Sequence, residues 1–321
     1  KEKGANAVIY NSPKLIDNLV KYEHYYSKPK LMLKQGLEEE PTIVISSTTD
    51  FTEQLFTQAG MKWKKVFKKG MSENNSEKLT FKLEINKPTK YLESENVLAY
   101  IPGTETPEEV IVLTAHYDHI GKEGDKVFNG ADDDGTGTVT MLEIAQAFQQ
   151  AVADGKGPKR SILIMPVSGE EKGLLGSKYY SENPVFPLEN TVANLNVDMI
   201  GRYDDNHEKG DNYVYLIGSD KLSTELHEVS KRVNELYTNI ELDYTFNDEN
   251  DPNRFYYRSD HYNFAKNKVP VIFYFSGVHE DYHKETDTVE KIDYEKTARI
   301  ARLVFYTAWE LANREERIRL D

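Results

Sequence analysis

The sequence predicts an α/β protein whose central sheet is largely parallel. From about residue 89 onward, continuous apolar runs recur along the chain, and segments with apolar residues at helical spacing lie between them. A continuous apolar run is typical of a strand that is buried on both faces, and alternation of such strands with helices is typical of a parallel sheet covered by helices. The expected strands are 110–115, 161–167, 193–197, 213–217 and 269–275, and the expected helices are 138–149, 222–236 and 294–312.

Residues 1–88 have a different character, so we expect two domains, 1–88 and 89–321. The first domain should contain strands at 5–10 and 41–46 and a helix at 50–59 that Thr49 or Asp50 caps. Alternating apolar residues predict a further strand at 79–85. No cluster of acids, bases or metal ligands occurs in this region, which favours a structural or interaction module.

The composition excludes several classes of function. With 40 Lys and Arg against 54 Asp and Glu, the formal net charge is −14, which argues against nucleic acid and anionic membranes as partners. The absence of cysteine removes disulfides, thiolate zinc sites and cysteine nucleophiles. No apolar run approaches the roughly 18 residues of a membrane-spanning helix. The first residues do not resemble a signal peptide, and we expect a processed or trimmed form that begins within a domain.

Three successive carboxylates, Asp132, Asp133 and Asp134, stand between glycines where an apolar strand pattern gives way to a helix pattern. Adjacent like charges repel, and a divalent cation is the natural partner for oxygen ligands held close together. An EF-hand loop does not fit, because Met141 would occupy the position of its final glutamate. An isolated acidic triplet is more often a solvated turn, so the interpretation depends on further ligands elsewhere.

Further ligands do follow the predicted strands. His116 and Asp118 come directly after the first strand, Glu170 and Glu171 after the second, and Asp198 after the third. Functional groups in open α/β sheets gather beyond the carboxyl ends of the strands, so these side chains should meet at one edge. His116 and Asp118 can act as a ligand and the carboxylate that orients it.

The neighbouring glutamates can divide the work of metal-assisted hydrolysis. Adjacent side chains diverge, so one carboxylate can bind metal while the other accepts a proton from the attacking water. A last ligand is expected late in the chain, where His261, His279 and His283 all compete on composition alone.

The ordered set of motifs resembles the M28 family of zinc aminopeptidases over roughly residues 90–312. The motifs that carry the resemblance are His116-x-Asp118, Gly130-Ala131-Asp132-Asp133-Asp134-Gly135, Glu170-Glu171-x-Gly173-Leu174-x-Gly176-Ser177, Asp198-Met199, Ser259-Asp260-His261 and His283-x-x-x-Asp287-Thr288. The resemblance implies a mixed, largely parallel central sheet flanked by helices, and a centre of two Zn²⁺ ions. His116 and Asp198 would bind one ion, Glu171 and His283 the other, and Asp133 would bridge both.

The resemblance also implies the roles of the remaining residues. Glu170 would be the general base, Asp118 would orient the site, and Tyr256 would help to hold the substrate carbonyl. A non-proline cis peptide is expected between Asp133 and Asp134. We expect Asp134 to help set the turn and Asp132 to face neighbouring backbone or solvent. Lys284 departs from the threonine that is usual after the ligand histidine, at a position that is not a ligand.

Charge counting supports the two-ion interpretation. Two Zn²⁺ ions carry four positive charges, and Asp133, Glu171 and Asp198 carry three negative ones. The surplus of one suits a metal-bridging hydroxide as nucleophile.

The implied substrate is a peptide with a free N-terminus, from which one amino acid is removed. An M28-type carboxypeptidase or dipeptidase would use the same metals with different recognition of the chain end. The complete ligand set argues against a single-zinc glutaminyl-cyclase-like transferase and against a non-catalytic receptor-like domain. A calcium-binding structural module would use oxygen ligands rather than two histidines.

The first 88 residues resemble the later part of a protease-associated domain. The resemblance rests on Lys3-Gly4-Ala5-Asn6-Ala7-Val8-Ile9 and on residues 41–45 with the helix after them. Such a domain is often inserted into M28 catalytic domains, and these architectures are usually exported. We therefore expect a periplasmic or extracellular protein.

Overall fold

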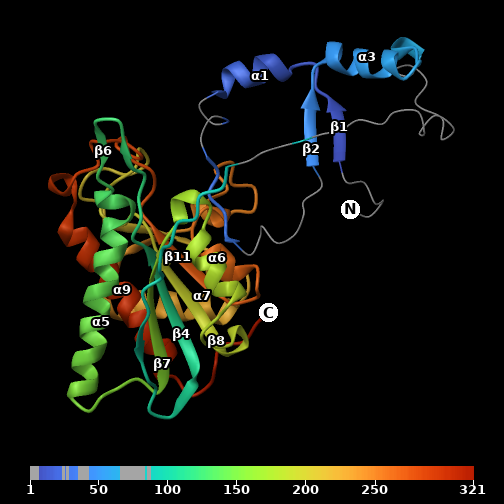
Figure 1. Ribbon diagram of the computed structural model, residues 1–321. Helices are drawn as coiled ribbons and strands as arrows, with labels where there is room; N and C mark the ends of the chain where they lie inside the picture. The colour runs from blue at the N-terminus through green and yellow to red at the C-terminus, as the bar shows by residue number, and fades with distance from the viewer. Residues whose placement is uncertain (1–6, 24–25, 27–28, 35–42, 66–83, 85–87) are drawn as a thin grey trace. The chain divides into compact units, whose positions relative to one another are not determined.

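The computed structural model describes residues 7–23, 26, 29–34, 43–65, 84 and 88–321. The chain divides into two compact units, Lys1–Leu92 and Glu93–Asp321 (Figure 1). We describe each unit by itself. The strand expected at 79–85 falls outside the described residues except for Glu84, which has no regular structure.

The described residues of the first unit include a short parallel strand pair and a helix after each of its strands. Strand β1 (Ala7–Asn11) pairs in parallel with β2 (Ile43–Ser47), so that Ala7 lies opposite Ile43. Helix α1 (Leu15–Lys21) follows β1, and α3 (Thr49–Gln58) follows β2. The cap of α3 is Thr48, one residue before the expected Thr49, and its hydroxyl accepts a hydrogen bond from the Phe51 N–H at 3.2 Å.

The second unit is built on a seven-stranded mixed sheet, as predicted. The strand order is β10-β9-β11-β8-β4-β7-β3. Neighbouring strands pair in parallel except at β3–β7 and β9–β11. The strands are β3 (Ala99–Ile101), β4 (Thr106–His116), β7 (Arg160–Val167), β8 (Thr191–Val197), β9 (Tyr213–Ile217), β10 (Glu241–Asp243) and β11 (Val271–Phe275).

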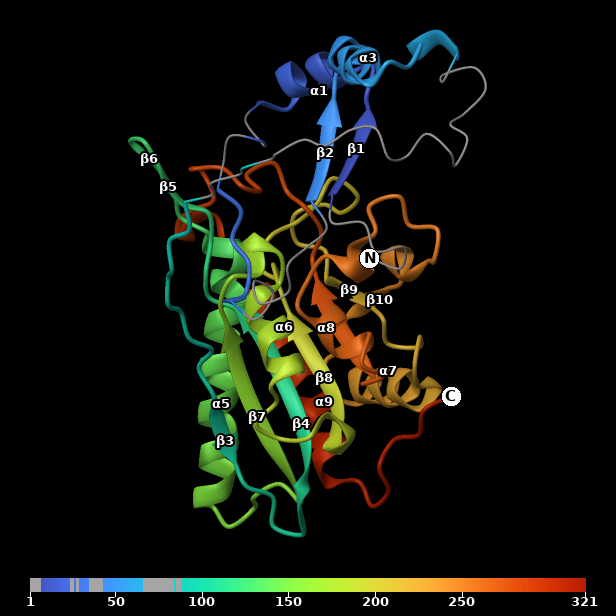
Figure 2. The ribbon, with the colours of Figure 1, turned by 45° about the vertical axis from the view of Figure 1, so that its right-hand side comes forward.

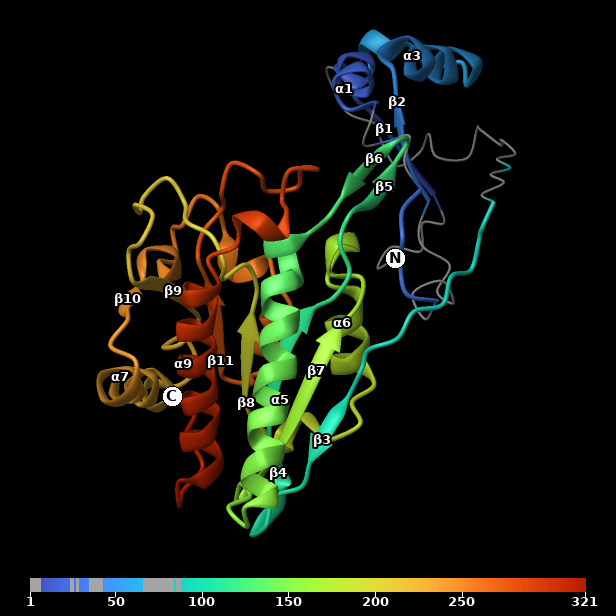
Figure 3. The same ribbon diagram turned by 90° about the vertical axis from the view of Figure 1, so that its left-hand side faces the viewer.

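Helices cover both faces of this sheet. Helices α5 (Gly137–Ala153), α7 (Thr224–Tyr237) and α9 (Tyr294–Asn313) pack on one face, where α5 and α9 run side by side (Figure 3). Helices α6 (Leu175–Glu182) and α8 (His261–Ala265) pack on the other face (Figure 2). Within the described residues, no helix combines the length and apolar character needed to cross a bilayer.

Strand β4 shows how the sequence creates the two layers. Residues two apart in a strand point to the same face. Ile111 and Leu113 accordingly lie in the core under α5 and α9, whereas Val110 and Val112 lie in the core under α6 and α8. Burial on both faces explains why the part of this strand from Val110 onward is an apolar run in the sequence.

The central strands β4, β7, β8 and β11 are mutually parallel, so their carboxyl ends share one edge of the sheet. A short antiparallel pair, β5 (Gly121–Glu123) and β6 (Lys126–Phe128), follows β4 on the way to the acidic segment before α5. The residues after each central strand therefore face a common site.

Candidate metal centre

Gly130 lies directly before the acidic segment 131–136, and its backbone is left-handed, with φ +63°. A Cβ added at Gly130 would lie 2.6 Å from the carbonyl oxygen of Asp133 and 2.6 Å from Cγ of His119. Glycine is therefore needed both for the turn and for the close approach of these neighbours.

Asp134 fixes the acidic segment to the ends of two strands. Its Oδ2 accepts a hydrogen bond from the backbone N–H of His116 at 3.1 Å, and its Oδ1 accepts from Gly137 at 2.9 Å and Met199 at 3.2 Å. The peptide bond between Asp133 and Asp134 is cis, as the family resemblance implied. Asp134 sets the turn, in agreement with its expected role.

Asp132 is fully buried and faces neighbouring backbone, which is one of the two surroundings expected for it. Its Oδ1 accepts hydrogen bonds from the Gly201 N–H at 2.7 Å and the Thr136 hydroxyl at 3.0 Å. Its Oδ2 lies 3.3 Å from His279 Nε2. The backbone N–H of Asp132 donates in turn to both carboxylate oxygens of Asp287. These contacts leave Asp133 as the carboxylate that is free to face the site.

One group of possible metal ligands consists of His116, Asp133 and Asp198. His116 Nε2 lies 3.1 Å from Asp133 Oδ1 and 3.6 Å from Asp198 Oδ1. Asp198 is oriented by the Ser259 hydroxyl, which donates to Oδ2 at 2.7 Å and leaves Oδ1 toward the group. Ligand atoms about 2.0–2.1 Å from a tetrahedral zinc are about 3.3 Å apart, so these separations suit one ion.

A second group consists of His119, Asp133 and Glu171. His119 Nδ1 lies 2.9 Å from Glu171 Oε1 and 3.8 Å from Asp133 Oδ2. His283 reaches the same two carboxylates, with Nε2 3.1 Å from Asp133 Oδ2 and 3.3 Å from Glu171 Oε2. The two oxygens of Asp133 thus face two different sets of ligands.

The donor atoms of this cluster fit a metal ion because several are buried without a partner. Buried polar atoms in folded proteins nearly always have a hydrogen-bond partner. Yet among the described residues no hydrogen bond is made by Asp133 Oδ2, Glu171 Oε1, Asp198 Oδ1 or either ring nitrogen of His119. The unsatisfied oxygens and nitrogens converge on the same space, and they are the ligand types that zinc takes.

The pKa shifts in the cluster also show that its carboxylates favour a neighbouring positive charge. Burial opposes a charge on His116, but Asp198 and Asp133 outweigh burial and raise the pKa of the imidazole well above its usual value. Against the same opposition from burial, Asp133 and Glu171 raise the pKa of His283 to about 9. Burial likewise disfavours ionised Asp133, but His116 and His283 lower the pKa of its carboxyl. The carboxylates of the cluster therefore favour positive charge between them, which a metal ion can supply.

Glu170 lies beside the His116 group and is held by Asp118. The Glu170 N–H donates to Asp118 Oδ1 at 3.1 Å, and Glu170 Oε2 lies 4.0 Å from His116 Nε2. The backbone carbonyl of Asp118 lies 2.9 Å from His116 Nδ1, which leaves Nε2 directed at the ligand group. Burial raises the pKa of the Glu170 carboxyl, and Asp198 adds to this rise. A carboxyl with a raised pKa is suited to exchanging protons near neutral pH.

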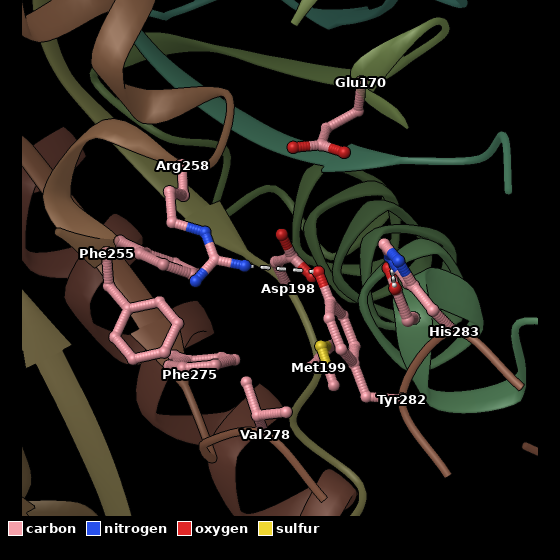
Figure 4. A pocket seen from close by; sticks show the side chains of 11 residues that line it. Glu170, Asp198, Met199, Phe255, Arg258, Phe275, Val278, Tyr282 and His283 are labelled. Atoms are coloured by element: carbon pink, nitrogen blue, oxygen red, sulfur yellow. Dashed lines mark hydrogen bonds and ion pairs between the residues drawn. The ribbon is translucent and has the colours of Figure 1, made fainter. Parts of the chain in front are cut away.

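A pocket of about 350 Å³, including its open mouth, adjoins the cluster (Figure 4). Figure 4 shows Glu170, Asp198 and His283 around it, with Tyr282 beside His283. The Tyr282 ring stacks on the His283 ring at 3.8 Å between centroids. Asp133 also lines the pocket, and the other lining residues are mostly apolar: Met199, Phe255, Arg258, Phe273, Phe275 and Val278.

Tyr256, the tyrosine expected to contact substrate, is not among the residues that line this pocket. Its ring packs against Tyr257, His261 and Tyr262, and Lys221 lies over it at 5.1 Å. Tyr282 occupies the pocket instead.

Seven of the eight predicted site residues lie in the cluster; Tyr256 is the exception. The three late histidines that were possible ligands occupy different positions. His283 faces the carboxylates, His279 contacts Asp132 behind them, and His261 is buried against the Phe273 ring. Two residues were missed by sequence reasoning. His119 could have been noticed because it directly follows Asp118, and Tyr282 because it directly precedes His283.

Comparison with known proteins identifies relatives of the second unit. The model of peptidase family M28 matches residues 96–308. A probable zinc metalloprotease of Pyrenophora tritici-repentis is 30% identical over an alignment of 260 residues that covers 68% of this chain and 51% of that protein. A probable leucine aminopeptidase of Trichophyton verrucosum is 31% identical over 226 residues, covering 68% of this chain and 57% of that protein. The chain thus spans about half the length of the curated relatives it matches.

Solved structures share the fold. A zinc aminopeptidase from Bacillus subtilis, BSAP, aligns with a TM-score of 0.56 and 24% identity, over 69% of this chain and 51% of its own. LapB from Legionella pneumophila aligns with a TM-score of 0.57 and 20% identity, over 94% of this chain and 72% of its own.

Proposed function

Because this chain belongs to peptidase family M28, we propose that it is a two-zinc aminopeptidase that removes N-terminal amino acids from peptides. The observation that carries the proposal is the position of Asp133 between two histidines. Its Oδ1 lies 3.1 Å from His116 Nε2 and its Oδ2 lies 3.1 Å from His283 Nε2. A carboxylate with its two oxygens in separate ligand groups is suited to bridging two ions.

The proposed ligands are His116 and Asp198 for one ion, Glu171 and His283 for the other, and Asp133 for both. When bound, zinc supplies a Lewis acid that polarises the peptide carbonyl and lowers the pKa of water. These ligands provide nitrogen and oxygen donors, which suit zinc without any thiolate.

Glu170 is the proposed general base. Its carboxylate accepts the proton of the attacking water as the new C–O bond forms at the substrate carbonyl. It then donates this proton to the amine nitrogen as the C–N bond breaks. Asp118 positions Glu170, because the Asp118 carboxylate accepts a hydrogen bond from the Glu170 backbone N–H at 3.1 Å. The Tyr282 hydroxyl lies in the adjoining pocket, where it can donate to a substrate carbonyl.

The pocket beside Asp198 and Glu170 is the proposed site of the substrate's N-terminal side chain. Its walls of Phe255, Phe273, Phe275, Val278 and Met199 favour apolar side chains by burying them away from water. The family resemblance further supports an exported protein whose first unit is protease-associated-like.

A carboxypeptidase or dipeptidase is the second candidate, because Arg258 lines the same pocket. Its guanidinium lies 4.8 Å from the Phe255 ring centroid and donates only a long hydrogen bond, 3.4 Å, to the Tyr282 hydroxyl. Within the described part of the chain, no carboxylate lies at ion-pair distance from it. A guanidinium in this position can bind the terminal carboxylate of a short substrate.

The test combines metal analysis with a panel of peptides in matched forms. Each peptide is supplied free, N-acetylated and C-terminally amidated, and the released products are identified by mass spectrometry. An aminopeptidase cleaves the free and amidated forms and spares the acetylated form. Cleavage that needs a free carboxylate instead establishes the second candidate, and a protein that binds no zinc contradicts both.

A further inference from the structure

His119 is a half-buried histidine whose two ring nitrogens are buried and make no hydrogen bond with a described residue. The residue lies in the segment after β4, and its side chain is 9% exposed. Neither Nδ1 nor Nε2 makes a hydrogen bond with a described residue. Because buried ring nitrogens that make no hydrogen bond are costly, this environment suits an imidazole that binds a cation.

The surroundings of His119 direct it at the metal ligands. Nδ1 lies 2.9 Å from Glu171 Oε1, but the geometry is not that of a hydrogen bond. Two polar atoms that approach closely without a hydrogen bond are typical of two ligands of one absent ion. The ring is seated against Gly130, where any Cβ would clash with its Cβ and Cγ.

His119 and His283 converge on the same two carboxylates from different directions. Their rings are edge-to-face, with centroids 5.8 Å apart. His119 approaches Oε1 of Glu171 and His283 approaches Oε2, and both face Oδ2 of Asp133. His119, Asp133 and Glu171 form one group of possible ligands, and His283 approaches the two carboxylates of that group from another side. The other group has only His116, Asp133 and Asp198.

We propose that His119 is a fourth protein ligand, through Nδ1, of the zinc ion held by Asp133, Glu171 and His283. The two sites are then unequal. A zinc with four protein ligands is closed and firmly held, and a zinc with three keeps a position open for chemistry. Glu170 lies beside His116, at the site that stays open. This inference rests on the proposed two-zinc function and adds that the ion at the His119 site binds more tightly.

The test measures zinc binding by the full 321-residue chain after removal of metal with a chelator. Zn²⁺ is titrated in competition with a chromophoric chelator, and Co²⁺ absorption spectra report the ligand number at each site. His119→Ala and His119→Gln are compared with the wild type. Glutamine retains a polar side chain that packs in the same space, which keeps the test valid if alanine impairs folding. The matched control is His227→Ala. His227 is a half-buried histidine on α7, and its ring is hydrogen-bonded to the Ser219 hydroxyl.

The wild type should bind two zinc ions with different affinities. Both His119 variants should weaken the tighter affinity by at least about 10-fold and change its Co²⁺ spectrum, while the weaker affinity is unchanged. If both variants bind two ions with wild-type affinities and spectra, or if only the weaker site is affected, His119 is not the fourth ligand. If the wild type itself binds fewer than two ions, the two-zinc function is wrong and this inference falls with it.

Discussion

The carboxylate of Asp118 accepts a hydrogen bond from the backbone N–H of Glu170 at 3.1 Å, which joins the segment after β4 to the segment after β7. The backbone carbonyl of Asp118 also contacts His116. One residue thereby sets the relative positions of a proposed metal ligand and the proposed general base.

Replacing Asp118 with alanine should lower kcat by roughly 10- to 100-fold and leave zinc content unchanged. The side-chain acceptor of the Glu170 N–H is lost, whereas the backbone carbonyl that contacts His116 remains. Steady-state kinetics with elemental analysis would measure both effects. Asp118→Asn keeps an acceptor oxygen and should recover much of the activity; equal damage by both substitutions would contradict the positioning role.

Glu170→Gln should retain both zinc ions and lose at least about 100-fold in kcat, because glutamine cannot accept the proton of the attacking water. The comparison is with Glu182→Gln, at the exposed end of α6, which should behave like the wild type. More than a few per cent of wild-type turnover in the Glu170 variant would rule out its assignment as general base.

The variants Asp133→Ala and Asp132→Asn should distinguish the roles of two adjacent carboxylates. Loss of Asp133 removes the bridging ligand, so zinc content and zinc-dependent stability should fall together. Asp132 instead receives hydrogen bonds from Gly201 and Thr136, so its variant should lose thermal stability while it still binds zinc. Full zinc occupancy in Asp133→Ala, by elemental analysis, is the result that would exclude bridging.

Lys296 should make stability depend on pH. Its side chain is 1% exposed between the rings of Tyr203 and Tyr213, and burial lowers the pKa of its amine to about 7. Unfolded lysine has a pKa near 10.4, so between about pH 7 and 10 the unfolded chain binds a proton that the folded chain does not. Folding stability from this group therefore rises with pH across that window and is lowest below it.

Lys296→Met should remove this dependence, since methionine has a similar length and no charge. Between pH 7 and 9 the free energy of unfolding of the wild type should gain about 2 kcal/mol relative to the variant. Urea denaturation at both values measures the gain. A difference between the proteins that stays constant with pH would show that Lys296 does not titrate in this range.

Arg160→Met should destabilise the fold by about 3–5 kcal/mol, because it leaves Glu109 without its partner. The buried guanidinium bonds Glu109 and the carbonyl oxygens of Leu311, Arg314 and Glu315, which ties β7 to the end of α9. Arg319→Met breaks a solvent-exposed ion pair with Glu225 and should change stability by less than about 1 kcal/mol. Similar losses in the two variants by urea denaturation would contradict the distinction.

The sequence predicts most of the second unit because burial imposes a visible pattern. Strand β4 is an apolar run from Val110 to Ala115 because both of its faces are covered there, and the polar residues that come next stand out as candidates for the site. The same logic finds Glu170, Glu171 and Asp198 at the ends of their strands.

Other features depend on contacts that the sequence does not reveal. Tyr256 and Tyr282 both precede motif residues, but packing against Lys221 and His261 draws Tyr256 away from the pocket. Lys296 occupies a position typical of an exposed helix residue, and its burial between two tyrosines arises from segments far away in the chain. Asp132 resembles a surface residue in the sequence, but in the structure it is buried and accepts a hydrogen bond from the Gly201 N–H.

The candidate ligands lie at or beyond the carboxyl ends of four parallel strands, and they extend along the chain from His116 to His283. No local segment brings them together, so the binding site forms only once β4, β7, β8 and β11 have paired. An unfolded chain then has no comparable affinity, and every zinc ion bound shifts the folding equilibrium toward the native state by mass action. Zinc uptake would therefore report on completed folding of this unit, and a chelator would lower its melting temperature.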